Sequence, residues 1–163
     1  MEVPENDLAA GLRELVARRC RPSGPRCTVE IEGPDVDAHL QALDVDVATQ
    51  LYRIADEALT IALEHSHATT VCVRVRVQDD VLCLRVCDDG AIPEDTASVR
   101  ALYVRLMQYR AQVIGATLTV DTPEEMCTVV QCRLERQKAH SRVPLQTAWT
   151  DLLQADHNGF HSP

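Results

Sequence analysis

The amino-acid sequence predicts an α+β fold, a two-layer α/β sandwich in which a mixed sheet of about five strands is covered on one face by about three helices. Two observations carry this prediction. Segments in which an apolar residue recurs at every third or fourth position alternate with segments in which every second residue is apolar. The second kind comes mainly in pairs joined by short turns, which is typical of β-hairpins.

The 163 residues suffice for one domain with a single hydrophobic core and leave little room for a second domain. We expect this domain to span residues 1–135. Residues 136–163 are polar, and we expect a partly disordered tail there, with one or two turns of amphipathic helix over 146–154.

A first helix is expected over residues 7–19, where leucine and valine recur at helical spacing. The Pro-Ser-Gly-Pro segment at 22–25 ends this helix. Residues 27–32 alternate between apolar and polar types, which predicts a strand that ends at Gly33 and Pro34.

The longest helix is expected over residues 46–65, which carry an apolar stripe. A hairpin follows, with strands over 71–77 and 82–87 and a turn between them. Valine and leucine occupy alternate positions and predict a buried face. We interpret the other face as solvated, with arginines that pair with carboxylates and form no anion site: Arg74, Arg76 and Arg85.

A third helix is expected over residues 97–114, with Gly115 at its C-terminal cap. A second hairpin, with strands over 117–122 and 127–135, completes the sheet. We assign four apolar residues of the third helix to its buried side: Val99, Leu102, Leu106 and Val113.

Charge and hydropathy exclude two classes of function. The formal net charge is −9, whereas nucleic-acid binding requires a surplus of lysine and arginine. No stretch approaches the roughly 18 apolar residues of a membrane span. We therefore expect no nucleic-acid partner, no direct membrane insertion, and a cytoplasmic location, either as a free domain or as the cytosolic part of a membrane receptor.

Seven cysteines raise the question of a metal centre or a disulfide framework. No two of them form a Cys-x-x-Cys pair, the spacing that many structural zinc sites use. Most of them fall in or beside expected strands, where a cysteine behaves as a small buried hydrophobic residue. We therefore expect no metal site and no disulfide among them: Cys20, Cys27, Cys72, Cys83, Cys87, Cys127 and Cys132.

Three motifs in chain order carry a resemblance to a known family: LYRIADEALT at 51–60, VCDDG at 86–90 and IGATLTV at 114–120. From about residue 8 to 135 the chain resembles the ATP-binding domain of sensor histidine kinases, the HATPase or Bergerat fold shared with gyrase-type ATPases. The nitrate-sensor-like group is the most similar. The resemblance implies the two-layer fold predicted above.

The resemblance also assigns roles to individual residues. Asp88 matches the aspartate that binds the adenine amino group, and Gly90 matches the glycine of the same Asp-x-Gly motif. Glu57 and His65 match their family positions on the long helix. Read without the family, Asp88 and Gly90 would form an ordinary turn at a strand end, and Glu57 would belong to a solvated helix face.

The departures from the family concentrate where the phosphates of ATP would lie. Ile61 stands in place of the asparagine that supports magnesium, and Glu64 in place of a lysine. Ile92 replaces a glycine, and residues 103–107 replace the later glycine box, with only Arg105 offering a positive charge. Glycines let backbone amides approach phosphates, so their loss weakens such a site.

We therefore expect a degenerate histidine-kinase-like domain that neither binds nor hydrolyses ATP, requires no cofactor, and acts as a protein-interaction or regulatory module in two-component signalling. Ile92, Tyr103 and Leu106 form the candidate interaction surface, with Leu106 expected to be buried and Tyr103 available to a partner. One of these last two side chains should reach toward Ile61. Candidate partners are a response regulator, kinase dimerisation helices or a second copy. The alternative is the catalytic domain of a divergent sensor kinase, which would bind ATP and magnesium.

Overall fold

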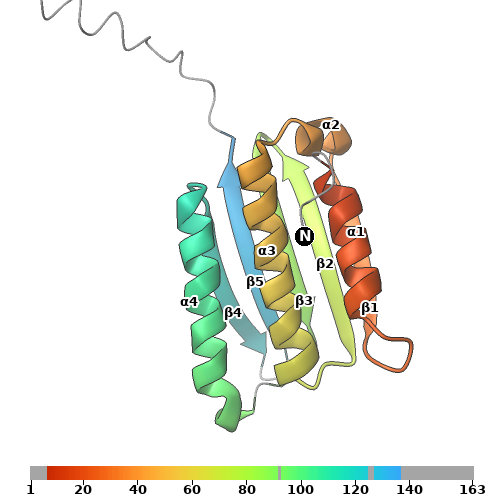
Figure 1. The fold of residues 1–163 in the computed structure, drawn as a ribbon, viewed down its shortest axis with the longest axis vertical. Helices are drawn as coiled ribbons and strands as arrows, with labels where there is room; N and C mark the ends of the chain where they lie inside the picture. The colour runs from red at the N-terminus through yellow and green to blue at the C-terminus, as the bar shows by residue number, and fades with distance from the viewer. Residues whose placement is uncertain (1–6, 92, 125–126, 137–163) are drawn as a thin grey trace, which may run out of the picture.

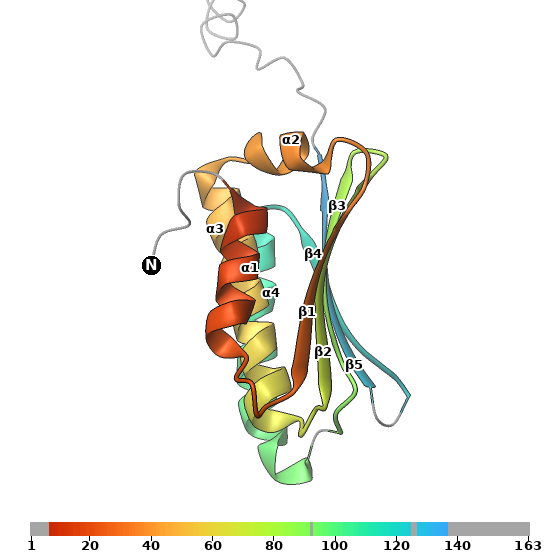
Figure 2. The ribbon, with the colours of Figure 1, turned by 90° about the vertical axis from the view of Figure 1, so that its right-hand side faces the viewer.

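The computed structural model describes residues 7–91, 93–124 and 127–136. Its sheet has five strands in the order β1-β2-β3-β5-β4, and helices cover one face only (Figures 1 and 2). The predicted two-layer α+β sandwich is confirmed. Its helices are α1 (Leu8–Arg19), α2 (Val36–Gln41), α3 (Val45–Thr60) and α4 (Ala97–Val113), and its strands are β1 (Arg26–Glu32), β2 (Thr70–Gln78), β3 (Val81–Asp88), β4 (Thr117–Glu124) and β5 (Cys127–Glu135).

The strand pairing explains why the alternating segments fold as they do. Strand β1 runs parallel to β2, and the remaining neighbours are antiparallel. Every second residue of β2 and β3 points toward the helices and is buried, and these residues are aliphatic apart from Asp88 at the end of β3. Branched side chains such as Val73 and Val75 pack well on a pleated surface and therefore favour a strand. Because they are buried, the same side chains also fill the core.

Two elements at the ends of the long helix differ from the prediction. The short helix α2 precedes α3 and contributes buried Leu40, although the sequence pattern gave no signal for it. The long helix extends over the predicted range, but its last turn, Ile61–His65, is π-helical. Such wider turns occur as single bulges in helices, frequently at functional sites.

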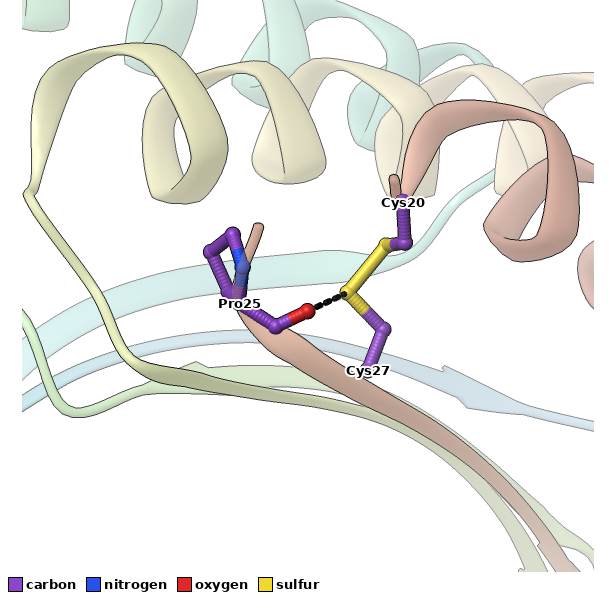
Figure 3. Close-up of a disulfide and its surroundings, with 3 residues drawn as sticks. All are labelled: Cys20, Pro25 and Cys27. Carbon is purple, nitrogen blue, oxygen red and sulfur yellow. Dashed lines mark hydrogen bonds between the residues drawn. A yellow bond between two sulfur atoms is a disulfide. The ribbon is translucent and has the colours of Figure 1, made fainter. Parts of the chain in front are cut away.

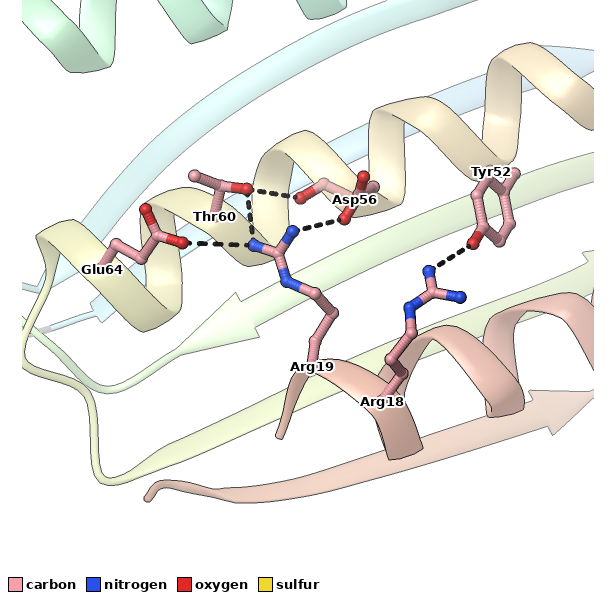
Figure 4. A network of polar contacts seen from close by, with 6 residues as sticks. All are labelled: Arg18, Arg19, Tyr52, Asp56, Thr60 and Glu64. Atoms are coloured by element: carbon pink, nitrogen blue, oxygen red, sulfur yellow. Dashed lines mark hydrogen bonds and ion pairs between the residues drawn. The ribbon is translucent and has the colours of Figure 1, made fainter. Parts of the chain in front are cut away.

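The end of α1 is fixed to α3 by polar contacts along one face of α3 (Figure 4). Arg19 donates from Nη1 to Oδ1 of Asp56 at 2.9 Å and from Nη2 to Oγ1 of Thr60 at 2.8 Å. Arg18 donates to the hydroxyl of Tyr52 at 3.0 Å. These acceptors lie four residues apart and therefore on one side of the helix.

The expectation that all seven cysteines are unpaired is wrong, because Cys20 and Cys27 form a disulfide (Figure 3). The intervening loop reverses the chain between the end of α1 and the start of β1 and brings the two Cα atoms to 6.3 Å, within the range that a disulfide spans. Sequence spacing carried no information about this reversal. Among the described residues the other five cysteines are free.

The assignment of the buried side of α4 is also wrong. Met107 and Ala111 are its buried residues, whereas Val99, Leu102, Leu106 and Val113 are all exposed. The helix carries apolar side chains on two faces, so periodicity alone does not identify the face that meets the core. The packing of α4 against α3 and β4 selects the face of Met107.

Some predictions concern residues that lie outside the described part of the chain. These are the position of Ile92 and the form of the tail over 137–163. The boundary of the domain near residue 135 stays a prediction.

Candidate functional site

Asp88 occupies the last position of β3, on the side of the sheet that faces the helices, and its side chain is buried. Its Oδ1 accepts a hydrogen bond from the backbone N–H of Gly90 at 2.9 Å. Burial raises the pKa of Asp88 above its ordinary value, and the hydrogen bond from Gly90 reduces this rise. The residue is thus a buried carboxyl group able to accept a hydrogen bond from a ligand's amino group.

Gly90 lies against the turn that follows α3. A Cβ atom at this position would stand 2.1 Å from the backbone oxygen of Ser66, far closer than van der Waals contact. Ser66 is itself fixed, because its hydroxyl donates to the carbonyl of Ala62 at 2.7 Å. The packing of two backbone segments therefore requires glycine here, whether or not a nucleotide is bound.

Asp89, between the two motif residues, ties the end of β3 to the start of β2. Its Oδ1 accepts hydrogen bonds from the backbone N–H groups of Thr69 at 2.7 Å and Thr70 at 2.9 Å, and its Oδ2 accepts from the Thr69 hydroxyl. These donors lower the pKa of Asp89 to about 2. Sequence reasoning assigned Asp89 no role, and only the pairing of the two strands shows one.

Glu57 is neutralised by a residue from another helix. Arg110 of α4 donates from Nε to Oε1 of Glu57 at 2.7 Å, and both side chains are largely buried. Desolvation raises the pKa of Glu57, and the hydrogen bond and charge of Arg110 act against that rise. Oε2 of Glu57 is buried and has no hydrogen-bond partner among the described residues. Nothing in the sequence signalled this pairing across 53 positions.

Ile61 is buried in the core, with 2% of its surface exposed. His65, four residues later, lies beside Tyr103 of α4, with ring centroids 6.1 Å apart. Tyr103 is half-buried, whereas Leu106 is 39% exposed. The expectation that Leu106 is the buried one of the pair is therefore wrong. α4 meets the end of α3 through the tyrosine ring at His65.

Glu64 and Arg105 lie apart from the other predicted residues. The carboxylate of Glu64 is 3.5 Å from Nη2 of Arg19, on the side of α3 that faces α1 (Figure 4). Glu57 and His65 contact α4 instead. Arg105 is exposed and lines a shallow hollow between α4 and Val120 of β4. The structure thus places Glu57 and His65 along the α3–α4 contact and does not bring Glu64 to it.

In the part of the chain that the structure describes, no three His, Cys, Asp or Glu side chains are grouped so as to hold a metal ion. Nor does any described helix have the length and apolar character to span a bilayer.

No protein-family model matches the chain. The sensor protein VraS of Staphylococcus aureus (strain COL) is 30% identical over 96 residues, which cover 58% of this chain and 28% of VraS. VraS of Staphylococcus epidermidis (strain ATCC 35984) is 26% identical over 135 residues, which cover 82% of this chain and 37% of that protein. The chain therefore spans about a third of the length of these relatives.

Solved structures give the same assignment. The blue-light activated histidine kinase of Erythrobacter litoralis EL346 superimposes with a TM-score of 0.63 and 25% identity, over 82% of this chain and 43% of that one. The catalytic domain of histidine kinase ThkA superimposes with a TM-score of 0.60 over 83% of this chain and 98% of the domain, at 15% identity. The chain is similar in sequence to sensor histidine kinases and has the fold of their ATPase catalytic domains.

Proposed function

We propose that this histidine-kinase-like domain does not bind ATP productively and acts as a protein-binding module in two-component signalling. One observation carries the proposal. The position at which the kinases place a magnesium-supporting asparagine is held by Ile61, whose side chain is buried among apolar residues. Magnesium is bound almost entirely through oxygen atoms, and a hydrocarbon side chain supplies none.

The surroundings of Ile61 support the same proposal. Glu57 is engaged by Arg110, and Tyr103 lies against His65. An ATP molecule entering between α3 and α4 would have to displace the tyrosine ring. Arg19 is bound to Asp56 on the side of α3 that faces α1, so its charge is already engaged and does not meet a triphosphate between α3 and α4.

The exposed face of α4 suggests how the domain functions instead. Five large apolar side chains follow one another at spacings of three and four residues, as in the seam of a coiled coil. Such a stripe on a solvent-exposed surface is typical of an interaction site. Their exposed fractions are 40% for Val99, 66% for Leu102, 39% for Leu106, 65% for Tyr109 and 57% for Val113. We call these five residues the α4 stripe.

The charge of α4 limits the kind of partner that can bind to the α4 stripe. The helix contains no acidic residue and three arginines, of which Arg110 is paired with Glu57, although the whole chain carries a net charge of −9. Two copies paired through the α4 stripe would bring arginines together, which disfavours a homodimer there. An amphipathic helix with acidic flanking residues is complementary. We propose that dimerisation helices of a kinase or a response regulator present such a helix, and that this chain forms the cytosolic part of a receptor.

Calorimetry of the purified domain with Mg-ATP tests the loss of nucleotide binding. We expect no saturable binding at millimolar nucleotide that depends on Asp88, and we expect the Ile61→Asn variant not to gain it, since Tyr103 remains in place. A micromolar Kd for the wild-type domain that Asp88→Asn abolishes would overturn the proposal. It would establish the alternative, the catalytic domain of a divergent sensor kinase, which the buried Asp88 and the similarity to VraS favour.

Peptide binding tests the role of the α4 stripe. Two labelled amphipathic helices with the same apolar face, one flanked by glutamate and the other by lysine, serve as probes in fluorescence anisotropy. We expect the acidic helix to bind more tightly and Leu102→Gln to weaken it by about tenfold, a loss of roughly 1.4 kcal/mol. Arg13→Gln, an exposed change on α1, is the control. Equal binding of both helices, or no effect of Leu102→Gln, would contradict the proposal.

A further inference from the structure

The face of the sheet opposite the helices is uncovered in the described part of the chain (Figure 2). Strand register places its side chains in rows that run across the sheet. One row joins Glu30 of β1, Arg74 of β2, Arg85 of β3 and Gln131 of β5. The next row joins Glu32, Arg76, Cys83 and Arg133. Four arginines from three strands therefore stand together on one face.

These four residues, Arg74, Arg76, Arg85 and Arg133, line a hollow of about 470 Å³ that we call the arginine groove. Gln131 and the acidic Asp79, at the β2–β3 turn, also line it. The sheet forms its floor, on the side remote from α3 and α4. The arginine groove is therefore separate from Asp88, which points toward the helices.

The arginines of this groove are only partly compensated by carboxylates. Arg74 is fully engaged, since Glu30 lies 2.5 Å from its guanidinium and Glu32 3.8 Å away. The pair of Arg133 with Glu135, at 3.8 Å, is exposed and weak. Arg76 and Arg85 form no ion pair with any described residue. The prediction that the arginines of this face pair with acidic residues thus holds for Arg74 alone among the three that it named.

Arg85 is the residue that points to a ligand. Its Nε is buried and has no hydrogen-bond partner within the described structure, and it stands directly opposite Arg74, a like charge. The charge of Arg74 is offset by Glu30, whereas Arg85 and Arg76 have no carboxylate within ion-pair distance among the described residues. A buried donor without a partner costs free energy. An anion seated on the sheet face beside Arg85 would satisfy this donor and balance the charges of Arg76 and Arg85.

We infer that the arginine groove binds a small anion of the phosphate type with two or more negative charges. Planar guanidinium groups form paired hydrogen bonds with phosphate oxygens, and Gln131 adds an amide donor. The net charge of −9 argues against a nucleic acid as the source of the phosphate, because an extended polyanion is repelled by a chain that is acidic as a whole. A compact anion meets only the groove itself.

Titration with inorganic pyrophosphate in a phosphate-free buffer of low ionic strength tests this site. We expect saturable binding to the full chain, and a loss of affinity of about tenfold or more in Arg76→Gln and in Arg85→Gln. Arg76 is exposed and unpaired, so its replacement leaves the fold intact even if Arg85→Gln fails to fold. The control Arg13→Gln, on the far layer, should bind within about twofold of the wild type. No saturable binding, or equal losses in Arg76→Gln and Arg13→Gln, would overturn the proposal.

ATP as a second probe keeps this inference separate from the proposed function. ATP binding that pyrophosphate displaces and Arg76→Gln weakens, but Asp88→Asn leaves unchanged, would support the arginine groove and show that no nucleotide binds at Asp88. Binding that Asp88→Asn abolishes and Arg76→Gln does not affect would overturn the proposed loss of nucleotide binding. In that case the pyrophosphate titration alone tests whether the arginine groove binds an anion. Added salt should weaken binding in the groove, because its arginines are partly exposed.

Discussion

Arg110 Nε lies 2.7 Å from Oε1 of Glu57, and this ion pair joins the last turn of α4 to the C-terminal part of α3. The resemblance predicts Glu57 at the nucleotide site, whereas its carboxylate is directed at a neighbouring helix and largely withdrawn from solvent. The pair therefore stabilises the packing of α4 in place of presenting a free carboxylate.

Replacing Arg110 by leucine should destabilise the domain by about 3 kcal/mol, because it leaves the carboxylate of Glu57 buried without a counter-charge. The double variant Glu57→Leu with Arg110→Leu should recover most of this loss. In the single variant the folded-state pKa of Glu57 rises above its unfolded value, so the loss should be largest at neutral pH and shrink as the carboxyl group is protonated. Denaturant unfolding at several pH values measures both effects. A loss that does not vary with pH would contradict the assignment.

Met107→Ala and Leu106→Ala form a matched test of which face of α4 is buried. Met107 is fully buried, so its truncation should lower the free energy of unfolding by about 2–5 kcal/mol. Leu106 is exposed in the α4 stripe, so its truncation should change stability by about 0.5 kcal/mol or less. Thermal or denaturant unfolding of the two variants checks this. The opposite order would mean that the helix packs with its other face inward.

Gly90→Ala tests the close approach of the turn after β3 to the end of α3. The added methyl group would stand 2.1 Å from the backbone oxygen of Ser66, and relieving that overlap should cost about 1–3 kcal/mol. Gly24→Ala is the control, since its nearest neighbour would lie at 3.4 Å. Unfolding midpoints for the two variants give the comparison, and equal stability would show that the backbone moves aside easily.

Asp89→Asn tests the hydrogen bonds that join β3 to β2. The folded-state pKa of Asp89 is about 2, below its ordinary value, so its stabilising contribution is complete above the unfolded pKa and disappears as pH falls toward 2. The wild type should therefore exceed the variant in stability at neutral pH, and the difference should vanish between about pH 4 and pH 2. Unfolding curves across this range measure the difference. The exposed Asp121→Asn change should leave the profile almost unaltered.

The sequence alone determined those elements whose apolar pattern allows only one face to be buried. Strands β2 and β3 alternate strictly, and only one of their faces is aliphatic, so their buried side followed from the order of residues. The apolar stripe of α3 likewise predicted the side of that helix that is buried. Asp88 and Gly90 were identified in order along the chain, and the structure places both at the end of β3, as the motif implied.

Only the tertiary structure decided what depends on contacts between distant segments. The helix α4 has two apolar faces, and packing alone selected Met107 over Leu106 for the core. The loop between α1 and β1 brought Cys20 to Cys27, and the crossing of α3 and α4 brought Arg110 to Glu57. Strand pairing likewise set Arg85 opposite Arg74 on the uncovered face. Periodicity reports which residues share a face of one element, whereas the partner of that face is fixed by the packing of the whole chain.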